Sequence, residues 1–168
     1  MTLRYEFQIK GRSRLAKPYH LKGVGLPNVY LLNGVEIEDD PDYGKLVTIA
    51  NLPDLHRAIG CSIVLKREAL TGDEMRYLRK QMQATQSALA RMLRVNQQTV
   101  ANYEKGKTEA GAADFAIRAL YLAHLTPEDD LADILRELAA VVVEDGEKPL
   151  HKRSAVAGPW REVEHRAS

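Results

Sequence analysis

Residues 85–107 contain several amide side chains whose types and spacing suit hydrogen bonding to a ligand. Gln98 and Asn102 lie four residues apart, so a helix would place both on one face. A glutamine or asparagine amide can both donate to and accept from the N7 and N6 edge of adenine in the DNA major groove. Gln97 and Ala101 form the adjacent row, where Ala101 could contact a thymine methyl group. The sequence therefore predicts a helix face that reads bases.

Two short helices joined by a turn of about three residues are predicted to position this face. The first begins at the N-cap Thr85, and the second begins near Asn96 and ends at Glu104, before Gly106. Ala90 is small at the point where the two helices must approach closely. The predicted buried side chains of this pair are Leu89, Ala90, Leu93, Val95, Val100 and Tyr103.

Further helices are predicted on both sides of this pair. Thr71 and Glu74 have the spacing of a capping box, and a helix of residues 112–124 is apolar on most sides. Thr126 and Pro127 begin another helix. Its apolar stripe, which could pack internally or form a dimer seam, consists of Leu131, Ile134, Leu138 and Val142.

Residues 70–125 resemble the Xre/Cro-like helix-turn-helix family, with T-Q-x-x-L-A from Thr85 and Y-E-x-G-K from Tyr103. The resemblance implies an all-α DNA-binding domain of five helices. The implied base-reading residues are Gln97, Gln98, Ala101 and Asn102. The implied contacts to the DNA backbone come from Gln86, Arg94, Asn96, Thr99, Lys105 and Lys107.

Arg94 stands in the turn where this family usually has glycine. We expect it to adopt a left-handed conformation, at a cost of about 1 kcal/mol. Its guanidinium adds a possible phosphate contact in return.

The N-terminal part of the chain predicts strands. Leu3, Tyr5, Phe7 and Ile9 alternate with polar residues, which is typical of a half-buried strand. Asn33-Gly34 predicts a hairpin between the β-prone residues 29–32 and 35–37. Another strand is predicted at residues 45–49, followed by a helix from about Pro53 whose inward residues are Leu55, Ile59, Ile63 and Val64.

The predicted fold class is therefore α+β. A small β-rich N-terminal domain (residues 1–68) is followed by an all-α five-helix Xre-type helix-turn-helix domain (residues 69–143) and a flexible tail (residues 144–168). This layout is similar to the MqsA (YgiT-type) antitoxins. That resemblance implies an N-terminal domain that holds zinc and binds a toxin, and a C-terminal domain that dimerises and represses its own operon. Because Cys61 is the one cysteine, the zinc site is not carried over, and we expect no metal and no cofactor.

The formal net charge of +1 hides bands of opposite sign. Residues 71–108 carry seven basic and three acidic side chains (+4), whereas residues 109–150 carry three basic and ten acidic ones (−7). Sign asymmetry between segments matters more than the total. The overall charge therefore does not exclude a nucleic-acid partner.

Several classes of function are disfavoured by the sequence. No acid/base pair, nucleophile elbow or phosphate loop is present, so we expect no enzymatic activity. His20, His56 and Cys61 lack the third group of a triad and are interpreted as structural, and the acidic residues 36–42 as a solvated turn. No segment predicts a signal peptide or a membrane span, so we expect a cytoplasmic protein with no membrane partner.

The predicted function is a sequence-specific DNA-binding transcriptional regulator, specifically a homodimeric repressor of antitoxin type that binds a palindromic operator in double-stranded DNA. The alternative is a protein-binding antitoxin module, in which the N-terminal domain neutralises a toxin and DNA binding is secondary.

Overall fold

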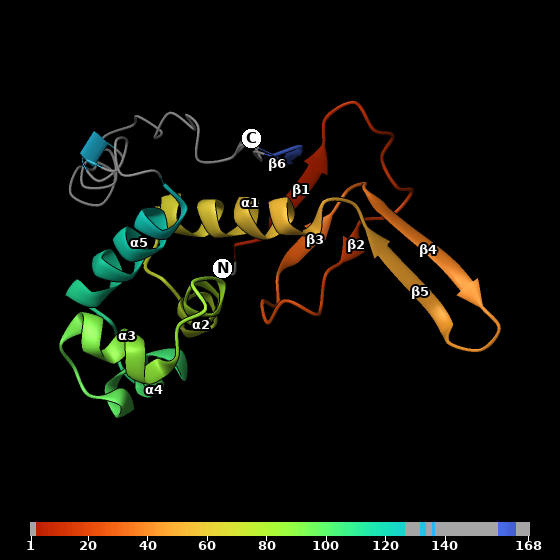
Figure 1. Cartoon of the computed structure of the whole chain (residues 1–168). Helices are drawn as coiled ribbons and strands as arrows, with labels where there is room; N and C mark the ends of the chain where they lie inside the picture. The colour runs from red at the N-terminus through yellow and green to blue at the C-terminus, as the bar shows by residue number, and fades with distance from the viewer. Residues whose placement is uncertain (1–2, 127–131, 134–135, 137–157, 164–168) are drawn as a thin grey trace. The chain divides into compact units, whose positions relative to one another are not determined.

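The computed structural model describes residues 3–126, 132–133, 136 and 158–163. The chain divides into two compact units: the first comprises Met1–Ile59 and Val156–Ser168, and the second comprises Gly60–Ala155. In the described part of the chain, a β-rich N-terminal region is followed by five helices, which confirms the predicted α+β class (Figure 1). Most of the helix predicted after Thr126, including all four residues of its apolar stripe, lies outside the described residues.

A four-stranded sheet forms the core of the first unit. Its strands, in spatial order, are β2 (Tyr19–His20), β3 (Val29–Leu31), β1 (Tyr5–Ile9) and β6 (Trp160–Glu162). Strand β1 is parallel to β3, with Tyr5 opposite Val29 and Phe7 opposite Leu31, and antiparallel to β6. The predicted apolar residues Tyr5, Phe7 and Ile9 are all buried, but Glu6 between them is buried as well, so the strand is covered on both faces there rather than alternating.

Strand β6 lies within residues 144–168, which we expected to be a flexible tail, and pairs antiparallel with β1. Trp160 is fully buried, and its indole Nε1 donates a hydrogen bond to Ala50 O at 2.7 Å. Gly34 packs against the indole so closely that a Cβ there would lie 2.6 Å from Trp160 Cη2. A strand of three residues has too little periodicity to be recognised in a sequence, and its partner β1 lies at the other end of the chain.

Strands β4 (Val35–Asp40) and β5 (Gly44–Ile49) form a separate antiparallel sheet of two strands. Figure 1 shows this hairpin extending away from the four-stranded sheet. The strand predicted at residues 45–49 is confirmed. The hairpin predicted at Asn33-Gly34 is wrong, because β3 pairs with β1 and β2 whereas β4 pairs with β5.

Asn33 is instead a buried bridge to the end of β1. Its Oδ1 accepts a hydrogen bond from Ile9 N at 2.7 Å, and its Nδ2 donates to Ile9 O at 3.0 Å and to Arg12 O at 3.1 Å. Gly34 then takes a φ of +72°, which residues with a side chain rarely adopt. The Asn-Gly pair therefore ends one sheet and directs the chain into the other.

The helices follow the hairpin in the order α1 (Leu52–Leu65), α2 (Gly72–Gln81), α3 (Gln86–Leu93), α4 (Gln97–Glu104) and α5 (Ala112–Leu125). The four inward residues predicted for α1 are fully buried. The predicted capping box is also confirmed: Thr71 N donates to Glu74 Oε2 at 2.7 Å, and Glu74 N donates to Thr71 Oγ1 at 3.3 Å.

Arg118 is a buried cation on α5 that no sequence pattern revealed. Its Nε donates to Asp114 Oδ1 at 2.6 Å. Its Nη1 donates to the carbonyl oxygens of Val64 (3.1 Å) and Lys66 (2.6 Å), and its Nη2 to that of Glu68 (2.6 Å). The last carbonyls of a helix have no partner within the helix. Arg118 therefore satisfies the carbonyls at and just after the end of α1 and ties α5 to them.

We expect Trp160→Ala to lower the free energy of unfolding by about 3–5 kcal/mol, because it leaves a cavity against Gly34 and deprives Ala50 O of its donor. Urea unfolding followed by circular dichroism measures the change. Tyr43→Ala, at a side chain that is 82% exposed, is the control and should change the free energy by less than about 0.5 kcal/mol. Equal effects of the two substitutions would contradict the packing described for β6.

Candidate nucleic-acid interface

Helices α3 and α4 and the turn between them form a helix-turn-helix pair whose ends are capped by side chains. Thr85 Oγ1 accepts from Ala88 N at 3.0 Å, and Asn96 Oδ1 accepts from Thr99 N at 2.8 Å. Both predicted helix starts are therefore confirmed. These caps satisfy amides that the first turn of a helix leaves without partners.

Arg94 adopts the left-handed conformation that was predicted, with φ 56° and ψ 40°. The next residue, Val95, donates its backbone N–H to Ala90 O at 3.0 Å, which closes the end of α3. The Arg94 side chain is exposed. The turn therefore keeps the backbone geometry that usually favours glycine while it carries a cation at the surface.

Glu104 is a buried carboxylate that joins three helices. Its side chain, only 2% exposed, comes from the end of α4. Arg79 from α2 donates to it through Nε (2.5 Å, to Oε1) and Nη2 (3.1 Å, to Oε2), and Arg76 Nε lies 3.6 Å from Oε2. Gln86 Nε2, from the start of α3, donates to Oε2 at 2.9 Å. The sequence motif included Glu104 but gave no sign of this role, because its partners lie 18 to 28 residues away.

The electrostatics of this cluster favour the ionised carboxylate. Burial alone would raise the pKa of Glu104, but hydrogen bonds from Arg79 and Gln86 and the charges of Arg79 and Arg76 outweigh burial and hold the pKa below its ordinary value of 4.5. A carboxylate that is buried and paired stays in place only while its partners remain. The orientation of α4 relative to α2 and α3 therefore depends on this ion-pair cluster.

Gln86, which we expect to contact a DNA phosphate, is half-buried and bound to Glu104. Its amide nitrogen carries two hydrogens, and the bond to Glu104 uses one of them. The second hydrogen can still donate to a phosphate oxygen. The cluster thus holds in a fixed position the donor that the interface would need.

The predicted base-reading residues lie on one side of α4. Gln97 and Gln98 are exposed, and Ala101 and Asn102 are half-buried. Gln98 Nε2 donates to Asn102 Oδ1 at 3.1 Å, so the two amides lie side by side. This bond uses neither Gln98 Oε1 nor the two hydrogens of Asn102 Nδ2, which can bind other partners. One acceptor and one donor next to each other match the N6 donor and N7 acceptor of adenine.

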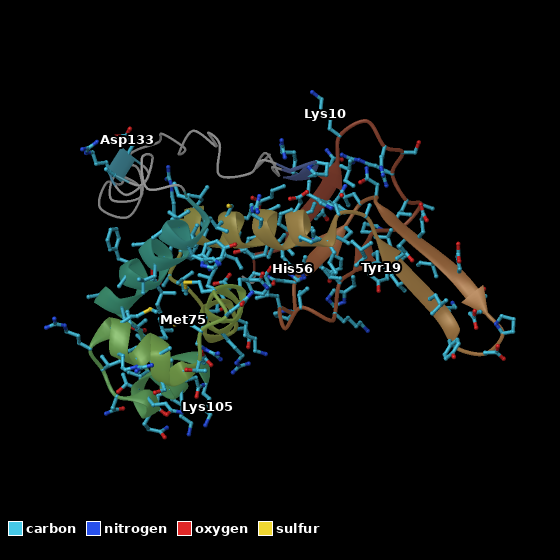
Figure 2. The ribbon with its side chains drawn as sticks, in the orientation of Figure 1. Lys10, Tyr19, His56, Met75, Lys105 and Asp133 are labelled. Atoms are coloured by element: carbon cyan, nitrogen blue, oxygen red, sulfur yellow. The ribbon has the colours of Figure 1, made fainter. Side chains whose placement is uncertain are left out.

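The predicted backbone contacts fall into two groups. Arg94, Lys105 and Lys107 are exposed cations around α4, and Figure 2 shows Lys105 at the end of this helix. Asn96 and Thr99 are bound to each other, since Asn96 Oδ1 accepts both the Thr99 N–H and, at 2.9 Å, the Thr99 hydroxyl. A phosphate contact from Thr99 would require one of these donors to leave Asn96, whereas Asn96 can donate through its own Nδ2.

Other kinds of site receive no support from the described residues. No three His, Cys, Asp or Glu side chains among them come together as metal ligands would. Cys61 is buried, and burial lowers the pKa of His56. No helix in the described ranges is long and apolar enough to span a bilayer.

Residues 75–115 match the model of a family described as helix-turn-helix. The match runs from α2 into the first turn of α5 and contains all of α3 and α4. This part of the chain is an Xre/Cro-like helix-turn-helix domain, which is a DNA-binding domain of transcription regulators and does not belong to an enzyme family. Comparison of the chain with curated proteins and with solved structures gives no match.

We expect acid to destabilise the domain through Glu104. Since its pKa is lower in the folded protein than 4.5, the folded state binds fewer protons than the unfolded state. The stability that Glu104 contributes is therefore complete above pH 4.5 and is lost as the pH falls through the lower, folded-state pKa.

Glu104→Gln tests this dependence. The variant should lose about 3 kcal/mol of unfolding free energy at neutral pH, because it leaves the half-buried Arg79 with a weaker partner. On acidification, the unfolding free energy of the variant should fall by less than that of the wild type, as measured by urea unfolding at a series of pH values. Glu109→Gln, at an exposed carboxylate, is the control. Parallel pH curves for wild type and Glu104→Gln would contradict the role of the cluster.

Proposed function

We propose that this protein is a sequence-specific, DNA-binding transcription regulator that represses its target, and that α4 is its recognition helix. The observation that carries the proposal is the bonded pair of Gln98 and Asn102 on the outer face of a helix-turn-helix domain. The core does not use these amides. In the major groove, Gln98 Oε1 accepts from N6 of an adenine and Asn102 Nδ2 donates to N7. Gln97 and Ala101 contact the neighbouring base pair.

The backbone contacts fix the position of α4 on the duplex. Arg94, Lys105 and Lys107 neutralise phosphates around the groove, and Gln86 and Asn96 donate amide hydrogens to phosphate oxygens. Thr99 contributes by holding Asn96 in place. Because the Glu104 cluster binds Gln86 and the end of α4, these contacts have a fixed spacing before DNA arrives.

We infer that the regulator acts as a homodimer on a palindromic operator in the cytoplasm. A single recognition helix reads only a few base pairs, and helix-turn-helix proteins gain specificity by pairing half-sites about 34–36 Å apart. Two copies on a two-fold axis would read two identical half-sites.

A second candidate is an antitoxin whose first unit binds and neutralises a partner protein. It is favoured by the separate compact unit of Met1–Ile59 with Val156–Ser168, which contains no residue of the helix-turn-helix match. Copurification of the full chain with a small protein encoded beside it, in equal amounts, would support this candidate. Recovery of the chain alone when both are expressed together would contradict it.

Loss of the amide pair should remove sequence preference. We expect Gln98→Ala and Asn102→Ala each to weaken binding to a preferred sequence by about 1–3 kcal/mol, because each removes half of the adenine contact. Binding to unrelated DNA should not change, since the phosphate contacts remain. The preferred sequence comes from selection on random DNA, and fluorescence anisotropy then gives both affinities. Failure of the wild type to select any sequence would overturn the proposal.

Loss of a phosphate contact should weaken DNA binding without changing the sequence preference. Lys107→Ala should weaken binding to all sequences alike and reduce the slope of log K against log salt by about 0.9. Lys22→Ala removes the same charge from an exposed side chain in the first unit, outside the β4–β5 hairpin, and serves as the matched control. A change in slope of equal size in both variants would indicate that Lys107 acts through net charge rather than through a phosphate.

A further inference from the structure

The β4–β5 hairpin is an exposed arm whose outer edges are both open in the described part of the chain. Its two strands pair only with each other, from Val35 opposite Ile49 to Asp40 opposite Gly44. Two-stranded hairpins are marginally stable in water without a further strand or a packed face. At the tip, Asp40 Oδ1 accepts from Asp42 N at 2.8 Å and from Tyr43 N at 2.9 Å, which fixes the turn.

The two edges of this arm differ sharply in charge. Strand β4 carries four carboxylates, at Glu36, Glu38, Asp39 and Asp40. Two β4 strands brought edge to edge would repel each other. Strand β5 carries one charge, on Lys45, and is otherwise glycine, threonine and aliphatic residues. Edge strands are normally protected by charges, prolines or bulges. The edge of β5 has little such protection and is the one suited to pairing with another strand.

One face of the hairpin bears an exposed apolar pair. Ile37 and Val47 lie opposite each other and are 52% and 40% exposed. Val35 and Ile49 continue this face toward the base of the hairpin. Toward the tip it ends with a residue pair of opposite charge, Asp39 and Lys45 on neighbouring strands.

The hydrogen-bond pattern shows which backbone groups lie on the open edge of β5. Ala50 N donates to Gly34 O at 3.0 Å, so residues 34 and 50 are a hydrogen-bonded pair. Such pairs alternate along an antiparallel ladder, so Ile37 and Val47 form a non-hydrogen-bonded pair. The N–H and C=O of Val47 therefore point away from β4, toward the open edge.

We propose that β5 pairs antiparallel with β5 of a second copy of this chain, with Val47 on the two-fold axis. The four strands β4-β5-β5-β4 then form one sheet, and a row of four apolar side chains crosses it: Ile37 and Val47 of one copy, then Val47 and Ile37 of the other. In the next row, Ile49 lies opposite Lys45 of the second copy. The aliphatic stem of this Lys45 covers Ile49, while its ammonium group stays beside Asp39 of its own copy. No like charges meet in this register.

This interface would place two recognition helices on one operator, and that role rests on the proposed function. The pairing of the two β5 strands does not rest on the proposed function, because it needs no DNA. A dimer that prefers no sequence would contradict only the proposed function. A monomer that still prefers one would contradict only this interface.

Sedimentation equilibrium of the full chain without DNA tests the pairing. We expect the wild type to dimerise and Val47→Pro to weaken the dimer by about 30-fold or more, because proline removes the edge N–H from both copies. The matched control is Ile37→Pro, which makes the same change in the same residue pair but on the β4 edge, and should still dimerise. A monomeric wild type, or a Val47→Pro variant that dimerises as well as the wild type, would overturn the proposal.

Disulfide trapping decides the case in which both proline variants are monomers. In the proposed register the two Val47 Cα atoms lie about 5.5 Å apart, within the range of a disulfide, whereas the two Lys45 Cα atoms are about 14 Å apart. Val47→Cys should therefore form a covalent dimer on mild oxidation, and Lys45→Cys and the wild type with its buried Cys61 should not. Equal trapping at residues 45 and 47, or none at 47, would overturn the register.

Discussion

The helix-turn-helix domain depends on one buried carboxylate. Glu104 sits at the end of α4, and the side chains that bind it come from α2 and α3. A buried charge without partners is so costly that these three helices can pack together in few ways other than the one that pairs it. The same cluster positions Gln86 and the C-terminal end of α4. The interaction that stabilises the domain therefore also sets the geometry of the proposed interface.

Short sequence patterns correctly predicted the features of the helices that depend on neighbouring residues. The capping box at Thr71 and the N-caps at Thr85 and Asn96 follow from residues within one turn of one another. The class of fold followed from such elements, whereas the left-handed Arg94 and the type of DNA-binding domain followed from the resemblance to the Xre/Cro-like family. The Glu104 cluster and the Arg118 contacts could not be predicted, because they join side chains with groups 18 to 54 residues away.

In the first unit, too, contacts between residues distant in the sequence could not be predicted. Asn33-Gly34 has the sequence of a tight hairpin, yet the Asn33 side chain bonds to the backbone of Ile9 and Arg12, and tertiary bonding overrides the local turn preference. Trp160 occupies the space beside Gly34, although nothing near Trp160 in the sequence indicates a strand. Both features involve contacts at or near β1 with residues distant in the sequence, 21 to 24 residues away for Asn33 and at the other end of the chain for β6, so no local pattern reveals them.

Internal hydrogen bonds already use many polar atoms of the residues that we propose as DNA contacts. Thr99 gives both of its donors to Asn96, and Gln86 gives one amide hydrogen to Glu104. Gln98 and Asn102 bind each other, and this bond leaves Gln98 Oε1 as an acceptor and Asn102 Nδ2 as a donor for other partners. Gln86 and Asn96 therefore combine an internal bond with a proposed phosphate contact, whereas the proposed contacts of Gln98 and Asn102 are to bases. Gln98 and Asn102, rather than Asn96 and Thr99, are thus suited to distinguish one base from another.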